Sequence, residues 1–179
     1  MKYKCLTKCI VLIGFLFSVH INAQDVETSY EISTDDTVQV TVFNEPDLSL
    51  EKVRIGTNGT ISMPLLGQVE VSGLTVQEIE AKLTMLFLDG YLKKPKVSVS
   101  VLEYRPFYIN GEVENPGSYP YRRGLTVEKA ITLAGGFTNR ADRKQIELVP
   151  EKDKETRGIV GLKASIQPGD VITVNESFF

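Results

Sequence analysis

Gly73-Leu74-Thr75-Val76-Gln77-Glu78 decides how this chain folds, because it marks the start of the clearest helix. The Thr75 hydroxyl can cap the free N–H groups of the first turn, and Glu78, three residues later, can complete a capping box. Apolar residues then recur on one face at spacings of three and four, at Val76, Ile79, Leu83 and Leu86. Asp89-Gly90 ends this pattern, so we expect an amphipathic helix between Thr75 and Asp89.

The same opening returns at Gly124-Leu125-Thr126-Val127. A helix of about two turns follows through Ala130, Ile131 and Ala134. Gly135-Gly136 stops it, with one glycine expected in the left-handed cap conformation. The chain is therefore expected to contain two units with one helix each.

Short runs of alternating apolar and polar residues predict strands around both helices. In the first unit they lie at 38–42, 53–55, 61–63, 69–71 and 97–101. In the second unit they lie at 107–113, 119–121, 146–149 and 171–174. Asn58-Gly59 is expected to supply the two positive-φ residues of a tight hairpin. Glu114-Asn115-Pro116-Gly117 predicts a further turn, and Glu151 to Arg157 a charged, solvated loop.

These elements indicate an α+β fold of two small domains, each a sheet of short strands with one helix packed on it. Asp36-Thr37-Val38-Gln39-Val40 near the start is echoed by Asp170-Val171-Ile172-Thr173-Val174 near the end. Two shared phrases are too few to establish a repeat.

Residues 1–23 have the order of a cleavable signal peptide. Three lysines precede an apolar run from Ile10 to Val19, and Ala23 offers a small residue before the cut. Ten apolar residues rise only about 15 Å as a helix, about half of a hydrocarbon core, so cleavage is favoured over a membrane anchor.

Cleavage after Ala23 would remove both cysteines, Cys5 and Cys9, and the only histidine, His20. The mature chain could then hold no disulfide, no thiol nucleophile, no Cys or His zinc site and no imidazole base. We expect neither a cofactor nor a metal. Bacterial lipoproteins acylate a Cys just after the apolar run, and this position holds none, so no lipid anchor is expected. The mature balance of 17 basic and 23 acidic residues, or −6, argues against nucleic acid as a partner.

A contact surface for a neighbouring subunit or a glycan is the main candidate site. Its residues surround the predicted turn after the first strand of the second unit: Gly111, Glu112, Asn115, Pro116, Gly117, Tyr119, Tyr121, Arg122 and Arg123. The simpler interpretation is that the glycines and the proline only shape a turn, and that the arginines are solvated. Tyr104, Tyr108, Tyr119 and Tyr121 have faces suited to sugar rings, but core or edge packing fits them equally well.

Other polar groupings point away from catalysis. Gly135-Gly136 ends a helix instead of starting one, so it is unsuited to a phosphate. Asp35 and Asp36 are adjacent and their side chains should diverge, while Glu112 and Glu114 should share a strand face and repel. Glycoside hydrolases hold two carboxyls across a cleft, and no cleft is indicated, so we expect no catalytic residues.

The chain resembles the outer-membrane polysaccharide export proteins, in which an export domain precedes a soluble-ligand-binding β-grasp (SLBB) domain. The first domain carries this resemblance in Tyr30-Glu31-Ile32, Asp36, Val38-Gln39-Val40, Val53-Arg54-Ile55, Asn58-Gly59-Thr60-Ile61, Met63-Pro64-Leu65-Leu66-Gly67, Gly73-Leu74-Thr75, Tyr91 and Pro95-Lys96-Val97-Ser98-Val99. The second carries it in Ile109-Asn110-Gly111-Glu112-Val113, Asn115-Pro116-Gly117, Leu133-Ala134-Gly135-Gly136 and Pro168-Gly169-Asp170-Val171-Ile172. It implies an export domain over 24–102 and a β-grasp-like domain over 103–179.

The resemblance also implies a ring-forming periplasmic subunit without catalytic residues, which guides capsule or exopolysaccharide together with an inner-membrane co-polymerase. Long members carry an acylated Cys and a C-terminal amphipathic helix that crosses the outer membrane. We expect neither feature in this chain, which resembles a short class that needs a separate outer-membrane channel. The alternative is a monomeric periplasmic module that binds a glycan, and an enzyme is the third hypothesis.

Overall fold

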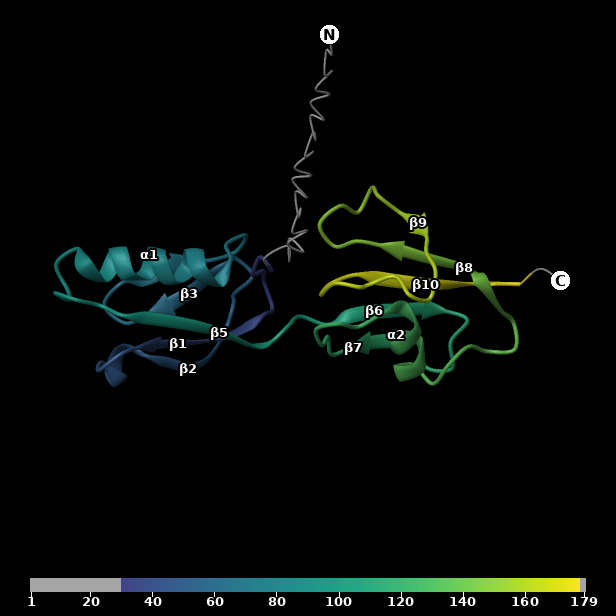
Figure 1. Cartoon of the computed structure of the whole chain (residues 1–179), viewed down its shortest axis with the longest axis horizontal. Helices are drawn as coiled ribbons and strands as arrows, with labels where there is room; N and C mark the ends of the chain where they lie inside the picture. The colour runs from purple at the N-terminus through teal and green to yellow at the C-terminus, as the bar shows by residue number, and fades with distance from the viewer. Residues whose placement is uncertain (1–29, 178–179) are drawn as a thin grey trace, which may run out of the picture.

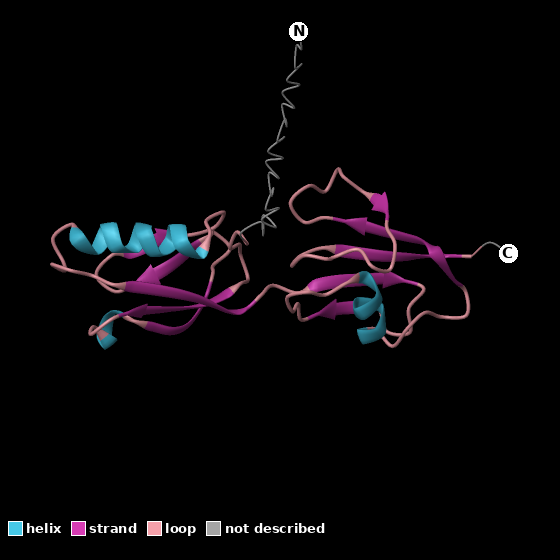
Figure 2. Ribbon diagram, viewed as in Figure 1, coloured by secondary structure: helices cyan, strands magenta, loops and turns pink. Residues whose placement is uncertain are grey.

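The structure, a computed structural model, describes residues 30–177 and consists of two domains placed end to end along the long axis (Figure 1). Each domain combines short strands with one α-helix, which confirms the predicted α+β class (Figure 2). The predicted signal peptide lies outside the described residues. Within residues 30–177, no helix is long and apolar enough to span a bilayer.

The first domain is built around β1 (Thr37–Val42), which lies between β2 (Leu50–Arg54) and β5 (Val97–Glu103) and is antiparallel to both. A 3-10 turn, η1 (Pro46–Leu48), joins β1 to β2. A separate hairpin is formed by β3 (Thr60–Met63) and β4 (Gly67–Glu70), and α1 (Val76–Leu88) contacts β5. The buried residues that form the centre of this core include Ile32, Val38, Val40, Ile61, Met63, Ile79, Leu83, Phe87 and Val99.

The predicted two-residue hairpin at Asn58-Gly59 is wrong. Of these two residues only Gly59 has a positive φ, of 74°. The turn closes instead through the Gly59 N–H, which donates to the Gly56 carbonyl at 2.9 Å, while the Asn58 side chain accepts from the Thr60 N–H at 3.3 Å. The chain does reverse here, but β2 pairs with β1 and β3 with β4, so the turn connects two sheets.

Helix α1 begins with the predicted capping box. The Thr75 hydroxyl accepts from the Glu78 N–H at 3.3 Å, and the Glu78 carboxylate accepts from the Thr75 N–H at 2.8 Å. The buried residues are Ile79, Leu83 and Phe87. Leu86, predicted on the same face, is 37% exposed, because 3.6 residues per turn place it at the margin of a stripe with a spacing of four.

The second domain is a five-stranded sheet in the order β7-β6-β10-β8-β9. The strands are β6 (Phe107–Gly111), β7 (Gly117–Tyr119), β8 (Ala141–Val149), β9 (Gly158–Ile159) and β10 (Val171–Glu176). The central strand β10 is parallel to β6 and antiparallel to β8, and local sequence patterns do not reveal this pairing. Helix α2 (Val127–Leu133) packs its Val127, Ala130 and Ile131 into the core of this domain.

Two strand predictions in this domain extend too far. β6 ends at Gly111, where φ is 82°, and Val113 makes only an isolated bridge to Phe137. β7 ends before Pro120, which lacks an N–H for the ladder, so Tyr121 is outside the strand. At the end of α2 both Gly135 and Gly136 have positive φ, which confirms the predicted glycine stop.

Candidate functional site at the junction of the two domains

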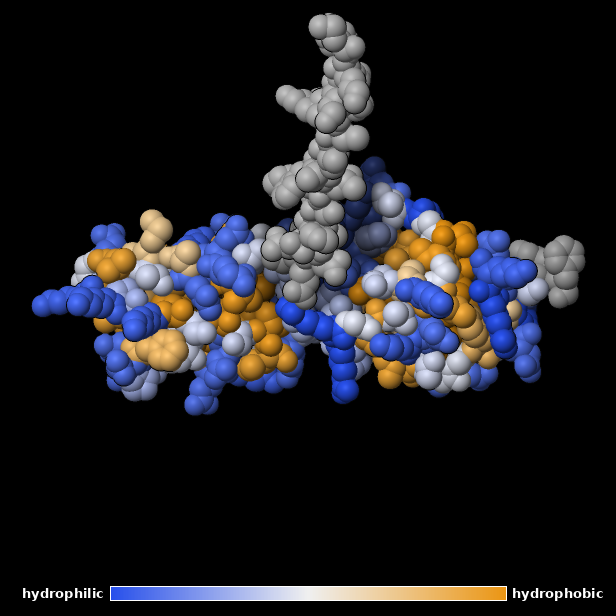
Figure 3. All heavy atoms as spheres, in the orientation of Figure 1, coloured by the Kyte–Doolittle hydropathy of each residue, from blue (hydrophilic) through white to orange (hydrophobic). Residues whose placement is uncertain are grey.

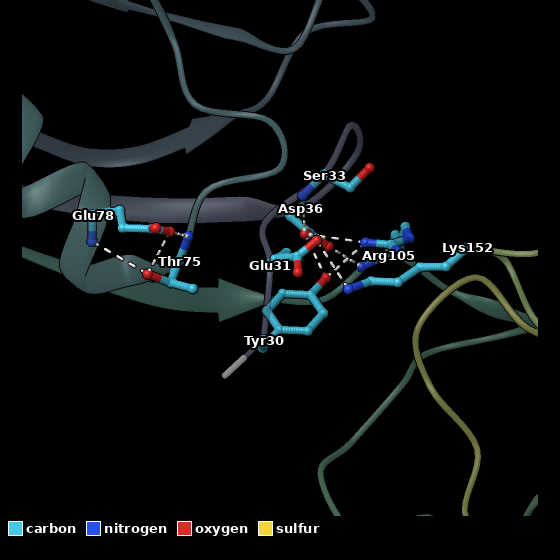
Figure 4. Close-up of polar contacts among 8 residues, drawn as sticks. All are labelled: Tyr30, Glu31, Ser33, Asp36, Thr75, Glu78, Arg105 and Lys152. Atoms are coloured by element: carbon cyan, nitrogen blue, oxygen red, sulfur yellow. Dashed lines mark hydrogen bonds and ion pairs between the residues drawn. The ribbon is translucent and has the colours of Figure 1, made fainter. Parts of the chain in front are cut away.

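The segment Tyr104-Arg105-Pro106 joins β5 of the first domain to β6 of the second. Arg105 turns back toward the first domain, where its backbone N–H donates to Asp36 Oδ1 at 2.8 Å. Its guanidinium donates to the Tyr30 hydroxyl at 2.8 Å and lies 3.4 Å from Asp36 Oδ2 (Figure 4). One residue of the connecting segment thus makes three polar contacts with the domain that precedes it.

Asp36 is the centre of this arrangement, and its side chain is fully buried. Asp36 Oδ2 also accepts from the Ser33 N–H at 2.8 Å and from the Tyr30 hydroxyl at 2.5 Å. We call Tyr30, Ser33, Asp36 and Arg105 the Asp36 cluster. A buried carboxylate is tolerated only when charged and hydrogen-bonding partners replace water, and this cluster supplies both.

The electrostatics of the cluster favour one protonation state of its tyrosine. Burial raises the pKa of Tyr30 far above its ordinary value, and the hydrogen bond to Asp36 raises it further. Tyr30 therefore stays neutral and keeps its O–H as a donor at physiological pH. The Arg105 guanidinium, 11% exposed, has its Nε buried without a hydrogen-bond partner in the described part of the chain.

Aromatic rings extend the junction into the second domain. Tyr104 makes edge-to-face contacts with Tyr30, with ring centroids 4.9 Å apart, and with Tyr121, at 5.5 Å. The Arg123 Nε donates to the Tyr104 hydroxyl at 2.8 Å, and its guanidinium lies over the Tyr104 ring. Tyr104 and Tyr121 are therefore held by packing, as the alternative prediction for these tyrosines proposed.

The second domain contributes its own buried carboxylate beside the junction. Asp170 accepts from the Gln167 N–H at 2.7 Å and from the Glu151 N–H at 3.1 Å. Burial raises the pKa of Asp170 above its ordinary value, although these N–H groups and Arg105 oppose the shift. An ion pair of 2.9 Å between Lys152 and Glu31 also crosses from one domain to the other (Figure 4).

A groove of about 540 Å³ opens next to the Asp36 cluster. It is lined by residues from the turn before β1, from β1, β2 and the end of β5, and from the connecting segment: Asp35, Thr37, Lys52, Arg54, Glu103, Tyr104 and Pro106. Its charges are paired, because Lys52 lies 2.7 Å from Glu103 and Arg54 lies 3.0 Å from Asp35. We call this the junction groove.

The structure divides the predicted contact residues between two places. Glu112, Asn115, Pro116, Gly117 and Tyr119 lie in or beside the loop between β6 and β7, and Tyr121 and Arg123 lie at the junction. Arg122 is exposed. The predicted set therefore combines residues of this loop with residues of the junction.

The loop itself is well bonded within the second domain. The Tyr119 hydroxyl donates to the Asn115 carbonyl at 2.5 Å, and the Asn115 N–H donates to the Ala134 carbonyl at 2.9 Å. At Gly111 an added Cβ would lie 2.1 Å from the carbonyl oxygen of Val174, so the close approach of β10 requires glycine. These contacts favour a structural role for the loop, with Pro116 and Gly117 exposed at its tip.

Tyr108 is more exposed than the other three tyrosines whose rings could stack on a sugar. It is 43% exposed on β6, whereas Tyr104, Tyr119 and Tyr121 are partly buried. Tyr119 stacks on Phe107, with ring centroids 6.0 Å apart. Only Tyr108 among the four therefore presents a largely open ring.

The carboxylates are spread out instead of paired for chemistry. Asp35 bonds Arg54 at the surface while Asp36 is buried, so the two side chains diverge as predicted. Glu112 accepts from the Thr138 hydroxyl at 2.5 Å. The sequence pattern predicts only repulsion from Glu114 and gives no sign of this hydrogen bond. Glu80 accepts from the Val99 N–H of β5 at 2.8 Å. Among residues 30–177, no group of three or more His, Cys, Asp or Glu side chains is placed to hold a metal ion.

Two of the residues at the centre of the junction were not singled out from the sequence as site residues. In the sequence Asp36 belongs to a strand pattern, to a pair of adjacent carboxylates and to a family motif. Arg105 has no local signal, since a single arginine between Tyr104 and Pro106 looks like an ordinary solvated charge. The one available hint is a charged residue that closely precedes an apolar strand pattern, as Asp36 precedes the strand predicted at 38–42.

Comparison with known proteins connects this two-domain arrangement to a family. Residues 24–102 match the family described as polysaccharide biosynthesis/export protein, and residues 106–159 match the SLBB domain. The exopolysaccharide production protein ExoF of Rhizobium meliloti is 43% identical over 93 residues, which cover 51% of this chain and 22% of ExoF.

Two further relatives cover more of the chain. The EPS I polysaccharide export outer membrane protein EpsA of Ralstonia nicotianae is 26% identical over 83% of this chain and 48% of its own length. The polysialic acid transport protein KpsD of Escherichia coli is 23% identical over 74% of this chain and 24% of its own length. The chain thus spans between about a fifth and a half of the relatives it matches. Because two consecutive family matches fall in the two folded domains in order, the chain belongs to the family of polysaccharide export proteins that carry an export domain followed by an SLBB domain.

Proposed function

We propose that this protein is a non-enzymatic subunit of a capsule or exopolysaccharide export assembly, and that it forms a periplasmic ring or collar through which polymer passes to the outer membrane. The observation that carries the proposal is the Asp36 cluster, which bonds the segment between the export domain and the SLBB domain to the export domain. A subunit of a closed ring must hold one shape, and a buried charged contact at the junction restricts hinge motion between the domains.

The proposal places residues 1–23 as a signal peptide, 24–102 as the export domain and 103–179 as the SLBB domain. The match to the export family begins at residue 24, directly after the proposed cut. The location is the periplasm, on the inner side of the outer membrane, in keeping with the name of EpsA, an outer membrane protein. The partners would be the polysaccharide, further copies of this chain, an inner-membrane co-polymerase and a separate outer-membrane channel.

A ring requires one surface of each subunit to bind a different surface of the next. The solvent side of α1 exposes apolar side chains that could serve this contact, since Met85 is 71% exposed and Leu88 is 52% exposed. Figure 3 shows hydrophobic and hydrophilic side chains side by side on the surface of the first domain. Residues 30–103 contain eleven acidic and six basic side chains, and residues 104–177 contain ten and eleven. Head-to-tail contact between an acidic domain and a slightly basic one is therefore electrostatically favourable. The loop from Gly111 to Gly117 is a second candidate for this contact.

The second candidate function is a monomeric periplasmic module that binds a glycan. The exposed ring of Tyr108 on the sheet of the second domain favours it, because aromatic faces suit the apolar faces of sugars. The two functions differ in self-association, since the module needs no second copy.

Electron microscopy and analytical ultracentrifugation of residues 24–179, with and without the inner-membrane co-polymerase, test the proposal. The ring predicts one defined high oligomer, alone or with the co-polymerase. A chain that stays monomeric under both conditions and binds sugar at a fixed stoichiometry would instead support the module.

A further inference from the structure

The junction groove has the position and the size of a ligand site. It lies where the two domains meet, and domain boundaries are a preferred location for binding sites. Its volume of about 540 Å³ falls inside the range of about 300–1,000 Å³ that such sites occupy. Its lining comes from the turn before β1, from β1, β2 and β5, and from the connecting segment, so a ligand there would contact the first domain and the segment that leads to the second.

The polar lining presents donors and acceptors in pairs. Arg54 and Asp35 form one pair, and Lys52 and Glu103 form the other. Thr37 also bonds to Glu103, and the Lys52 contact lowers the pKa of the Glu103 carboxyl, so this carboxylate remains charged in mild acid. Each pair places a cationic donor beside an anionic acceptor, which matches a hydroxyl that donates and accepts at once.

The net charge of this lining is zero, and this determines the class of ligand. A strongly anionic sugar would gain from Lys52 and Arg54 but would also meet the carboxylates of Asp35 and Glu103 that are paired with them. A neutral, hydroxyl-rich sugar would meet no repulsion and could bridge both ion pairs. Charge complementarity therefore favours a neutral sugar unit.

The rest of the lining supplies an apolar, rigid wall. Tyr104 is fixed by ring contacts on two sides and by the Arg123 hydrogen bond, and Pro106 has a locked φ. Apolar ring carbons of a pyranose can pack on such a wall while its hydroxyls reach the ion pairs. Since the wall is already ordered, binding would cost little conformational entropy.

We infer that the junction groove is a binding subsite for a neutral sugar unit of the exported polysaccharide, with Lys52, Arg54, Asp35 and Glu103 as its hydrogen-bonding residues. This inference rests on the proposed function and assigns the polymer a contact point on the subunit. A shallow groove whose charges are already paired binds a sugar weakly. Weak binding suits a surface that must release a polymer as it moves past.

Nuclear magnetic resonance titration of the ¹⁵N-labelled protein tests the inference directly. The full chain is expressed with its N-terminal segment, so that the cell processes it, and is titrated with cellohexaose, maltohexaose and laminarihexaose as neutral probes and with oligogalacturonate as the anionic probe. We expect at least one neutral probe to shift the amide signals of Thr37, Lys52, Arg54 and Tyr104 in a saturable manner. The anionic probe should shift them less.

The double variant Lys52→Gln/Arg54→Gln should bind that probe about tenfold more weakly or not at all, because hydrogen bonds to charged groups are lost. Both side chains are more than half exposed, so the variant should keep the wild-type melting temperature. Arg140→Gln is the matched control, since Arg140 forms an equally exposed ion pair with Glu176 outside the groove.

Shifts confined to other residues, stronger binding of oligogalacturonate, or no saturable shift with any probe would each overturn the subsite. These results would leave the proposed function standing if deletion of the gene still abolishes export. Loss of export in the double-variant strain, with normal export in the Arg140→Gln strain, would support the subsite in the cell. Normal export without the gene would refute the proposed function itself.

Discussion

Replacing Asp36 by Asn is the sharpest test of how the two domains are held together. The substitution keeps the shape of the side chain but removes its charge and one of its two acceptor oxygens. In the folded protein both oxygens are occupied, Oδ1 by the Arg105 N–H and Oδ2 by Tyr30, Ser33 and the Arg105 guanidinium. An amide must turn its NH₂ group toward one of these donors, whichever way it is rotated.

The expected loss follows from burial. Asp36 is fully buried and the Arg105 side chain is only 11% exposed, so Asp36→Asn leaves a nearly buried cation without its counter-ion. Breaking a buried ion pair on one side costs about 3–5 kcal/mol of unfolding free energy. For a chain of this size that corresponds to a fall in melting temperature of roughly 6–20 °C.

The assay is urea unfolding and calorimetry of the wild type, Asp36→Asn and the matched control Asp35→Asn. Asp35 is the adjacent carboxylate, but its ion pair with Arg54 is exposed, and such pairs contribute about 1 kcal/mol or less. We expect a large loss for Asp36→Asn and a small one for Asp35→Asn. Equal effects of the two substitutions, or a loss below about 1 kcal/mol for Asp36→Asn, would refute the reasoning.

Three further predictions concern other parts of the chain. Gly111→Ala should lower the free energy of unfolding by about 3 kcal/mol or more, because its Cβ would collide with β10 and φ at this position is 82°. Gly117→Ala is the control, since the space around Gly117 is open, and it should have no adverse effect in the same urea unfolding assay. The raised pKa of Tyr30 means that the unfolded chain releases a proton above about pH 10 that the folded chain retains, so stability present below pH 10 is lost as the pH rises. The assay is denaturant unfolding of the wild type and of Tyr30→Phe at several pH values above about 10. The free energy of unfolding should fall less steeply with pH in the variant, by about 1.4 kcal/mol per pH unit, and equal slopes in the two proteins would contradict the burial of Tyr30. Met85→Asp and Leu88→Asp should leave folding intact and abolish high oligomers in ultracentrifugation, and rings that persist would exclude this face of α1 as a subunit contact.

Local sequence patterns predicted the elements that depend on neighbouring residues. The capping box at Thr75 and the glycine stop at Gly135-Gly136 each need only a few consecutive residues, so they could be recognised from the sequence. The dipeptide Asn58-Gly59 predicts a tight hairpin because it is typical of such turns. Which strands pair across it is decided by the whole domain, and β2 pairs with β1 instead.

The junction could not be predicted in the same way. The contact between Asp36 and Arg105 joins residues 69 positions apart, and no periodicity reports a single long-range ion pair. The loop from Gly111 to Gly117 is a predicted contact site because it gathers glycine, proline and asparagine in a short stretch. The structure gives a local reason for them, the close approach of Gly111 to β10 and the hydrogen bonds of Asn115 to Ala134 and Tyr119.

The measurement that tests the central claim most directly is the amount of polysaccharide released by a strain that lacks this gene, compared with the wild type and with a strain complemented by the full chain. The account predicts that extracellular polymer falls sharply, that polymer accumulates inside the cell, and that complementation restores release. Undiminished release of polymer by the deletion strain would contradict it.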